Sequence, residues 1–389
     1  MVPVTGGACQ NEGEDLSRRT HLRTRIDDRG VLEVVDPGWD CIDLMRLCDP
    51  DFEPRWAPLT GFTMPRFLRL QQLSCGYAQS AIEELPTSRL WNINNLNKET
   101  VFDKAAKLAE PNDASILDLK IELARRILMR CTFCAHRCGV NRTAGEKGIC
   151  RLGSEALVAE HFVHIGEEPI VNPSLLVSLA GCGLRCKYCQ QSAILDPSGT
   201  DGEVLEPSLW SALDKSGARS MSFAGGNPDE SMYAILRFLN AAPSNWELPI
   251  VWNCHGATTP ETLALLDGVV DVWIPDFKYG NNLCARKLSR IDGYWDVVRD
   301  AVEKMLDQEA PVIVRILVLP GHSECCHMPV LQELSRHAHR ENLQVSIRGQ
   351  YCPDWKIGPR DGELIHRSGY QEIVALIHQA QSLRLKLVD

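Results

Sequence analysis

The chain has 389 residues, of which 44% are hydrophobic and 24% charged, which is typical of a folded globular protein with one large domain or two ordinary ones. Its 51 acidic residues outnumber its 41 basic ones and give a formal net charge of −10, so the chain lacks the basic surface expected of a nucleic-acid-binding protein. No stretch approaches the roughly 18 uninterrupted apolar residues of a membrane-spanning helix, and the start has no apolar signal segment. We therefore expect a cytoplasmic protein with neither a nucleic-acid nor a membrane partner.

Residues 1–112 are predicted to form an N-terminal extension, partly disordered. Residues 1–30 are polar and charged without periodicity, which is typical of a loose tail. From 31 to 112, short apolar runs such as 31–35 and 39–47 alternate with proline and glycine, and they predict a small irregular α+β segment. This part of the sequence contains no catalytic motif that we can identify.

A helix is predicted directly after the extension. Asp113 is the expected N-cap, and isoleucines and leucines recur at helical spacing from Ile116 to Ile127. Arginines in the last turn suit the negative end of the helix dipole, and the helix is expected to end at Cys131. Residues 113–160 are therefore assigned to a helix followed by a four-cysteine metal-binding segment.

Sixteen cysteines are about twice the ordinary number for this length, and in a reducing cytoplasm they favour metal binding over disulfides. Seven of them form two groups along the chain. The first group, called the quartet, consists of Cys131, Cys134, Cys138 and Cys150, and the second, called the triplet, consists of Cys182, Cys186 and Cys189. We expect the function to depend on these two groups.

Six short β-branched runs, each followed by an amphipathic stretch, characterise residues 161–389. The expected strands are 175–180, 220–224, 250–253, 270–275, 312–319 and 343–347, and the expected helices lie near 206–216, 230–241, 259–266, 294–308 and 328–340. Nearly continuous apolar strands that alternate with helices predict a parallel sheet covered on its faces. Six such units predict an α/β fold, a partial (β/α)6 TIM-like barrel with its chemistry at the carboxyl ends of the strands.

The triplet follows the first of these strands in the pattern C-x3-C-x2-C. Three thiolates from one loop leave one iron of a [4Fe-4S] cluster without a protein ligand, whereas four cysteines would close every position. A structural zinc ion would require a fourth thiolate or imidazole nearby, and the three residues after Cys189 supply none. The spacing favours a cluster with one open iron over a zinc site or a loop of buried thiols.

This loop, placed after the first strand of a partial barrel, resembles the defining motif of the radical SAM superfamily. The resemblance implies a 4Fe-4S iron–sulfur enzyme, classed among oxidoreductases, in which the open iron binds S-adenosylmethionine (SAM). One electron from the cluster then cleaves SAM to a 5′-deoxyadenosyl radical, which abstracts hydrogen from a substrate. The resemblance also implies an electron donor of the flavodoxin or ferredoxin type. The rival hypothesis is a non-catalytic iron–sulfur or zinc protein with a fourth protein ligand on the central cluster.

Two strand ends resemble SAM-binding motifs of this superfamily. Gly225 and Gly226 stand where a Gly-Gly-Glu motif binds the SAM amino group, with Asn227 in place of the glutamate, and a plain turn is the alternative. Asp276 and Lys278 lie on one face of a strand end. They resemble the Asp-x-Lys of pyruvate formate-lyase activating enzymes, in which the lysine meets the SAM carboxylate, and a surface ion pair is the alternative.

Three further features extend this resemblance, which covers about residues 128–355. Residues 314–321 resemble a V-R-x-x-V-x-P-G strand that precedes a SAM-contacting histidine, here His322 or His327. Asn253, a candidate cofactor contact, stands where the activating enzymes have an aspartate that holds a monovalent cation, so the carboxylate of that cation site is missing. A cysteine block similar to the quartet precedes the barrel in PflX-like relatives of the activating enzymes.

The metal of the quartet is left open by the sequence. Zinc, held by four thiolates or with His136 replacing one, and an auxiliary [4Fe-4S] cluster both satisfy the pattern, and reduced thiols without metal are the third alternative. Adjacent Cys325 and Cys326 beside His327 indicate either a metal or redox site or simple packing of buried thiols.

The resemblance implies a protein or peptide substrate, in an activase-like or peptide-modifying reaction. A radical reaction on a small molecule is the alternative. The polar segment 346–351 follows the last strand, where it is expected either to line the substrate side of the barrel or to form a surface loop.

Overall fold

The computed structural model describes residues 24–26, 32–34, 64–96, 106–215 and 217–388, which fall into two units, 1–54 and 55–389. In the first unit, β1 (Thr24–Ile26) and β2 (Leu32–Val34) pair antiparallel. The rest of the expected tail and the apolar run at 39–47 lie outside the described residues. No helix within the described residues is long and apolar enough to cross a membrane.

The second unit begins with short helices and a two-stranded sheet. These elements are α2 (Arg66–Gln72), β3 (Ser74–Ala78), α3 (Gln79–Ile82), α4 (Thr87–Leu96) and β4 (Asp113–Ser115), with β3 and β4 antiparallel. Hydrogen bonds tie this part to later elements, since Gln71 Nε2 donates to Asn240 O at 2.6 Å and Arg66 N donates to Asp271 Oδ1 at 3.1 Å. The described part of the expected α+β segment is therefore attached to the main sheet domain.

Helix α5 (Ile116–Leu128) begins at a different cap from the one predicted. Ser115 is the N-cap: its hydroxyl accepts from Asp118 N at 3.0 Å, while Asp118 accepts from Ser115 N at 2.9 Å, which is a capping box. Asp113 belongs to β4 instead, where its carboxylate accepts from Ser74 Oγ at 3.0 Å. The helix was predicted correctly and its cap was not, because strand pairing engages Asp113.

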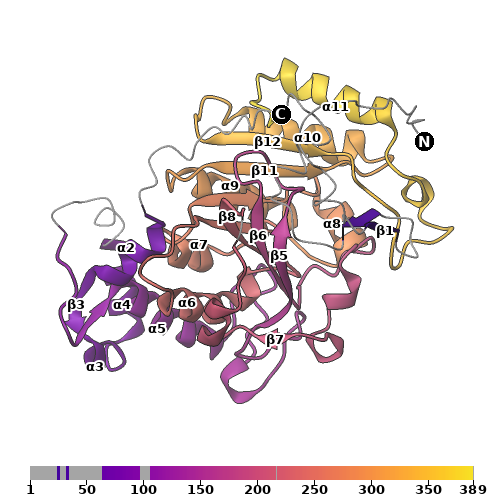
Figure 1. Cartoon of the computed structure of the whole chain (residues 1–389). Coiled ribbons are helices and arrows are strands. Elements are labelled where there is room, and N and C mark those ends of the chain that lie inside the picture. The colour runs from indigo at the N-terminus through magenta and orange to yellow at the C-terminus, as the bar shows by residue number, and fades with distance from the viewer. Residues whose placement is uncertain (1–23, 27–31, 35–63, 97–105, 216, 389) are drawn as a thin grey trace, which may run out of the picture. The chain divides into compact units, whose positions relative to one another are not determined.

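A single eight-stranded sheet dominates the second unit (Figure 1). Its strands are β5 (Leu157–His164), β6 (Ser174–Leu179), β7 (Glu203–Val204), β8 (Ser220–Gly225), β9 (Ile250–Cys254), β10 (Val272–Pro275), β11 (Val312–Leu317) and β12 (Leu343–Arg348), in the order β12-β11-β10-β9-β8-β6-β5-β7. The six strands β6, β8, β9, β10, β11 and β12 are parallel and coincide with the six predicted strands, which confirms the α/β class. The antiparallel strands β5 and β7 add an edge that was not predicted.

The helices of this region largely follow the predicted ranges. They are α6 (Met232–Asn240), α7 (Pro260–Leu266), α8 (Asn282–Ser289), α9 (Tyr294–Leu306), α10 (Met328–Ser335) and α11 (Tyr370–Ser382). Short 3-10 turns occur at Arg142–Ala144, Ser192–Ile194, Pro197–Gly199, Pro207–Ser211, Asp229–Ser231 and Gly362–Ile365, and a π-helix, η8, at Ser323–His327. The prediction of a helix at 206–216 is wrong. Only a 3-10 turn forms there, because polar residues and Gly217 follow it. Helices α8 and α11 were not predicted.

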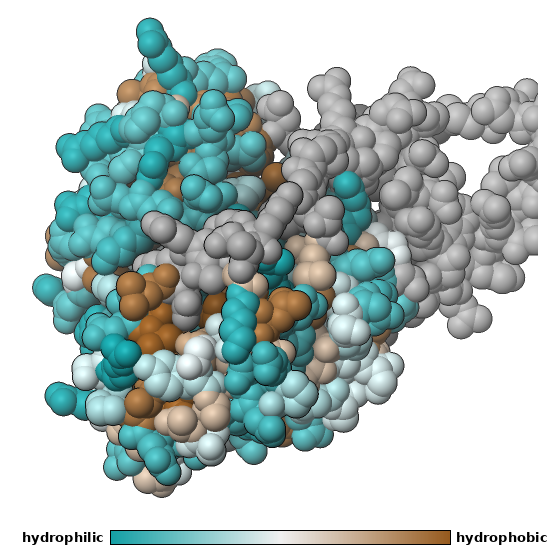
Figure 2. Space-filling model, turned by 90° about the vertical axis from the view of Figure 1, so that its left-hand side faces the viewer, coloured by the Kyte–Doolittle hydropathy of each residue, from teal (hydrophilic) through white to brown (hydrophobic). Residues whose placement is uncertain are grey.

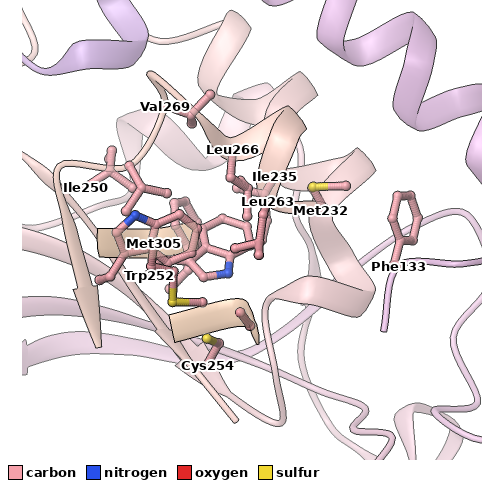
Figure 3. Packing of buried hydrophobic residues seen from close by; sticks show 14 of the residues in the cluster. Phe133, Met232, Ile235, Ile250, Trp252, Cys254, Leu263, Leu266, Val269 and Met305 are labelled. Carbon is pink, nitrogen blue, oxygen red and sulfur yellow. The ribbon is translucent and has the colours of Figure 1, made fainter. Parts of the chain in front are cut away.

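The two faces of the sheet are filled differently. On one face, Ile250 and Trp252 of β9 are fully buried beneath helices, and Figure 3 shows Trp252 among Leu263 and Met305. On the other face, a small apolar cluster consists of Val171, Val251, Val272, Ile274 and Ile313. The alternation of side chains along β9 puts Val251 in this cluster and Asn253 nearer the carboxyl end. This second face of the sheet is therefore apolar toward the amino ends of the strands and polar toward their carboxyl ends.

The surface of the molecule is mainly hydrophilic where Figure 2 shows it, and hydrophobic residues form only a few groups on that face. Among the described residues, the most exposed large hydrophobic side chains are Tyr370, Leu96 and Leu283, at 80%, 77% and 73% exposure. They come from separate helices, and isolated exposed residues of this kind are ordinary in folded proteins.

Candidate active site

A cavity of about 350 Å³ lies at the carboxyl ends of the parallel strands. Its lining includes Cys182, Cys186, Cys189, Gly225, Gly226, Asn253, Asp276 and Lys278. Residues so distant in the sequence meet here because the carboxyl ends of parallel strands share one edge of the sheet. The cavity has the size of a small-molecule site, and it contains every predicted cofactor contact except His322.

The triplet cysteines lie in the loop that follows β6. Burial, with Glu230 and Cys186 nearby, raises the pKa of the Cys182 thiol well above its usual value. Burial and Cys186 raise the pKa of Cys189 to about 11, and Cys186 Sγ accepts a hydrogen bond from Ser289 Oγ at 2.9 Å. Without metal, the Cys182 and Cys189 thiols are protonated at neutral pH, so metal binding must displace their protons.

The spread of the sulfur atoms distinguishes between kinds of metal centre. A tetrahedral zinc ion holds its thiolates about 3.8 Å apart, whereas the thiolates of a [4Fe-4S] cluster bind separate irons and lie farther apart. Within the described residues, three ligand atoms lie within 4.8 Å of one another only in the group of Cys284, His322 and Cys325. Within the described residues, neither the triplet nor the quartet is gathered as tightly as that group.

Three other thiol or imidazole side chains, His164, Cys254 and His255, also border the cavity. His255 Nε2 lies 3.3 Å from Glu230 Oε1, and its Nδ1 accepts from Ala257 N at 3.1 Å. The Cys254 thiol faces Thr258 Oγ1 at 3.8 Å. Both ring nitrogens of His255 are therefore engaged within the protein.

The glycine pair at the end of β8 packs directly against the triplet loop. Gly226 N donates to Leu179 O at 2.6 Å, and a Cβ atom on Gly226 would lie only 2.1 Å from Gly181 O. Gly225 has a φ of +95°, and a Cβ there would lie 2.5 Å from Leu179 N. Glycine is required at both positions so that the end of β8 can approach the loop that carries Cys182.

Asp276 and Lys278 form an ion pair in the cavity wall, so they are not the surface pair considered as the alternative. Lys278 Nζ donates to Asp276 Oδ2 at 2.5 Å, and the side chains are 14% and 21% exposed. Burial acts to lower the pKa of Lys278, but the carboxylate of Asp276 and the negative charge that Cys186 carries as a thiolate outweigh it, and the net shift is upward. The lysine is therefore a persistent cation within the cavity.

Glu230, which was not identified from the sequence, connects three parts of the site. Its Oε1 accepts from Gly183 N in the triplet loop at 3.0 Å, its Oε2 accepts from Asn227 Nδ2, and it pairs with His255. The carboxyl group is completely buried, which would raise its pKa, but His255 and Asn227 outweigh this effect and lower it. Glu230 itself does not border the cavity, so its carboxylate supports the triplet loop and the end of β8 from behind the cavity wall. Adjacent acids at 229 and 230, before an apolar helix, were the available signal.

The quartet lies against the opposite side of the triplet loop. A Cβ atom on Gly183 would lie 3.6 Å from Cys134 Sγ, and His136 Nε2 lies 2.9 Å from Gly183 O. The buried Arg142 donates from Nη1 to Glu230 O at 2.7 Å. None of the quartet cysteines borders the cavity. The two cysteine groups are therefore neighbours on either side of one stretch of backbone.

A buried ion-pair cluster supports the far wall of the cavity and was not predicted. Arg315 donates to both carboxylate oxygens of Glu168, at 2.7 and 2.5 Å, and also pairs with Glu167. Arg348 Nη2 lies 2.8 Å from Glu168 Oε1. Burial would raise the pKa of Glu168, but Arg315 and Arg348 outweigh it and hold that pKa at about 2. These contacts fasten β11 and β12 to the segment that follows β5.

Neither histidine expected to contact SAM borders the cavity. The chain turns away after β11 at Pro320, so that His322 lies beside Cys284 and Cys325 instead. His327 is buried, and its Nε2 accepts from Leu319 N at 3.0 Å. Its burial lowers its pKa to about 4.

Sequence comparisons identify relatives of the chain. A sequence model of the Radical SAM superfamily matches residues 176–334. The chain is 32% identical over 317 residues to "Uncharacterized protein MJ0674" of Methanocaldococcus jannaschii, and the match covers 78% of this chain and 90% of that protein. The chain belongs to the radical SAM superfamily. It is accordingly an enzyme of SAM-dependent radical chemistry, with a [4Fe-4S] cluster and SAM as cofactors.

A structural comparison finds SuiB of Streptococcus suis, solved in a crystal structure bound to S-adenosylmethionine. The similarity has a TM-score of 0.36 at 11% identity, and it covers 53% of this chain and 47% of SuiB. The match thus spans less than half of SuiB. The superfamily match at 176–334 runs from β6 into α10 and contains the triplet, the glycine pair and Lys278.

Proposed function

We propose that the triplet holds the catalytic cluster and that the cavity binds SAM for radical attack on a protein or peptide. When bound, the cluster supplies the electron that cleaves the S–C5′ bond of SAM and so yields the radical that abstracts hydrogen. The observation that carries this proposal is the cavity, in which the three cysteines, the glycine pair and the Asp276–Lys278 ion pair come together. Six parallel strands with their crossovers support the partial barrel for 161–389, after an extension at 1–112 and a metal-binding segment at 113–160.

The cavity residues have complementary roles toward SAM. Lys278 is a buried cation that can pair with the SAM carboxylate, and Asp276 at 2.5 Å holds its ammonium group in place. The backbone carbonyls at Gly225 and Gly226 can accept from the SAM amino group, because no side chain shields them. Asn253 completes the polar wall.

A peptide segment is one substrate that the cavity can admit. A volume of about 350 Å³ is at the lower end for small-molecule sites, so a bound SAM would occupy most of it. The substrate must then reach the radical from the open side, which a flexible peptide segment can do by inserting one residue. The resemblance to pyruvate formate-lyase activating enzymes and their PflX-like relatives points to the same substrate class.

The quartet is proposed to hold an auxiliary [4Fe-4S] cluster that passes electrons to the triplet. Cys138 is exposed, whereas Cys134 and Cys150 are buried, and Cys134 lies beside Gly183 of the triplet loop. A cluster on these ligands would extend from the surface to the catalytic centre. An electron donor of the flavodoxin or ferredoxin type would then dock at Cys138.

The substrate class can be tested with deuterium. Extracts of the source organism grown in heavy water are separated by size into a macromolecular and a small-molecule fraction. Each is added to the anaerobically reconstituted enzyme with dithionite and unlabelled SAM, and the 5′-deoxyadenosine formed is analysed by mass spectrometry. Because the radical takes a hydrogen from its substrate, we expect deuterium in 5′-deoxyadenosine from the macromolecular fraction, and we expect protease treatment to remove the effect.

The same experiment can refute the proposal at two levels. Deuterium that comes only from the small-molecule fraction would replace the peptide hypothesis by the alternative of a small-molecule substrate. Absence of any 5′-deoxyadenosine from an enzyme with full iron content would contradict the proposed role of the triplet.

A further inference from the structure

A third group of metal-binding side chains lies outside both cysteine groups. Cys284 of α8 and the pair His322 and Cys325, at the start of η8, bring three ligand atoms within 4.8 Å of one another. No other three cysteine, histidine or acidic side chains of the described residues are gathered so closely. We propose that these three residues bind a zinc ion at a site separate from both clusters.

The distances in this group fit a mononuclear soft-metal site. Cys284 Sγ and Cys325 Sγ are 3.9 Å apart, close to the separation of about 3.8 Å between thiolates on one tetrahedral zinc ion. Cys326 Sγ lies 3.8 Å from Cys325 Sγ and is the nearest thiol for the fourth position. Thiolate and imidazole ligands together favour zinc over magnesium or calcium, which bind oxygen.

The tautomer of His322 suits a metal ligand. Its Nδ1 lies 2.9 Å from Pro320 O, and because a carbonyl oxygen only accepts, Nδ1 carries the hydrogen. Nε2 then keeps its lone pair. Metal-bound histidines commonly donate their second ring nitrogen to a backbone carbonyl in this way, which fixes the orientation of the ring.

The surrounding backbone is shaped to bring the ligands together. Asn281 Nδ2 donates to Cys325 O at 2.6 Å and lies 3.4 Å from Cys284 Sγ, so one amide touches both segments. A Cβ atom on Gly280 would lie 2.5 Å from Cys326 O, which makes glycine necessary for this approach. Residues 323–327 form a π-helix, an irregularity that often marks functional sites.

The position of the site indicates what zinc would do. Cys284 follows the segment after β10 that carries Asp276 and Lys278, while His322 and Cys325 follow β11. Zinc would join these two connections, with release of one proton from each thiol that becomes a ligand. We therefore assign it a structural role: it links the connection after β10 to the connection after β11.

A disulfide between Cys284 and Cys325 is the competing chemistry for these thiols. It would require the sulfur atoms to close from 3.9 Å to about 2.05 Å, and it would leave His322 without a role. The convergence of an imidazole with both thiols favours the metal.

The decisive measurement is zinc content in the holoenzyme. Wild type, Cys284→Ala/Cys325→Ala and the control Cys352→Ala are reconstituted anaerobically with iron and sulfide, exposed to zinc chloride and desalted. Zinc and iron per chain are then measured by inductively coupled plasma mass spectrometry. We expect the double variant to hold about one zinc less than wild type and the control, with the same iron content. Zinc bound in the quartet would contribute equally to all three proteins and cancel.

If the double variant does not fold, a second measurement on the wild-type protein still tests the proposal. The zinc K-edge absorption spectrum of the wild type should show both sulfur and nitrogen neighbours in the first coordination shell. Equal zinc content in all three proteins would overturn the proposal. A Cys284–Cys325 disulfide in peptide maps of the anaerobically prepared wild type would overturn it in favour of a redox pair.

Discussion

The triplet and the quartet are neighbours, yet they differ in what surrounds them. The triplet cysteines border a cavity, whereas none of the quartet cysteines does. The quartet has protein around Cys134 and Cys150 and reaches the surface only at Cys138. A metal centre can take part in chemistry on a bound molecule only where such space exists. This difference supports the proposed role of the triplet in the reaction and leaves electron transfer or a structural role for the quartet.

One buried residue, Glu230, contacts both groups. Glu230 accepts from Gly183 N on the triplet side, while its carbonyl oxygen accepts from Arg142 on the quartet side. Because both contacts come from one residue, a shift of either cysteine segment is transmitted to the other. Proximity and this common anchor argue that the two centres work together.

Replacing a triplet cysteine should have the largest effect, and it tests whether the triplet holds the centre at which the reaction takes place. Cys186→Ala should reduce dithionite-driven 5′-deoxyadenosine formation by about 10³-fold or more, because the cluster loses one of three ligands. Liquid chromatography of the quenched reaction measures the product. The control is Cys75→Ala, a buried cysteine of β3 far from both groups in the sequence. Product from Cys186→Ala at more than a tenth of the wild-type rate would contradict the assignment.

The wall of the cavity depends on a buried ion pair, and this predicts a large loss of stability. Glu168→Gln should destabilise the fold by about 3–5 kcal/mol, because Arg315 and Arg348 lose their buried counter-charge. Thermal melts of both proteins measure this. The pair of the half-buried His161 and the exposed Glu203 provides the control, since Glu203→Gln should cost less than about 1 kcal/mol.

The difference in stability between wild type and Glu168→Gln should shrink as the pH falls. The pKa of Glu168 falls from 4.5 in the unfolded chain to about 2 in the fold, so its contribution is present above pH 4.5 and is lost between about 4.5 and 2. The melting temperatures of wild type and Glu168→Gln should differ by a constant amount at neutral pH and converge below pH 4.5. A gap that persists unchanged to pH 3 would show that the carboxylate charge is not its cause.

Much of this site could be predicted from sequence because short motifs and strand periodicity encode it. The triplet spacing, the Gly225–Gly226 pair and the Asp276–Lys278 pair each follow a strand, and parallel strands bring such ends together. The six strands were predicted because their buried residues form nearly continuous apolar runs.

The rest could not be predicted, because it depends on contacts between distant segments. Glu168 and Arg315 are 147 positions apart in the sequence, and Arg142 and Glu230 are 88 positions apart. No local sequence pattern indicates that either pair is in contact. His322 or His327 was expected to contact SAM because the strand before them resembles a V-R-x-x-V-x-P-G strand, but the chain turns at Pro320 and His322 lies beside Cys284. Only the three-dimensional path of the loop decides between the two positions.

Removing the positive charge of Lys278 should have an intermediate effect. It tests whether SAM binds in the cavity beside the triplet. Lys278→Met should raise the KM for SAM by about 10- to 100-fold, since a hydrogen bond to a charged group contributes about 1.5–3 kcal/mol. Iron content should not change. Lys287→Met, on the exposed surface of α8, is the matched control. An unchanged KM with a lower kcat would instead place Lys278 in the chemical step rather than in SAM binding.

Replacing a quartet cysteine should have the smallest effect on the reaction. It is also the most direct test of whether the quartet and the triplet have different roles. Cys134→Ser should remove about four irons per chain if the quartet holds a cluster, but about one zinc if it holds zinc. Because dithionite can reduce the catalytic centre directly, 5′-deoxyadenosine formation with dithionite should stay within about threefold of wild type. With reduced flavodoxin as donor, it should fall by about tenfold, equivalent to about 1.4 kcal/mol in the barrier.

The contrast between the two reductants separates a relay from a structural role for the quartet. A structural site would lower the rate equally with both reductants, because the damage would reach the triplet through Gly183 and Glu230. A relay lowers it only with the protein donor, which must deliver its electron at the surface near Cys138. Equal losses would therefore remove electron transfer from the proposal and leave the quartet as a support for the triplet loop.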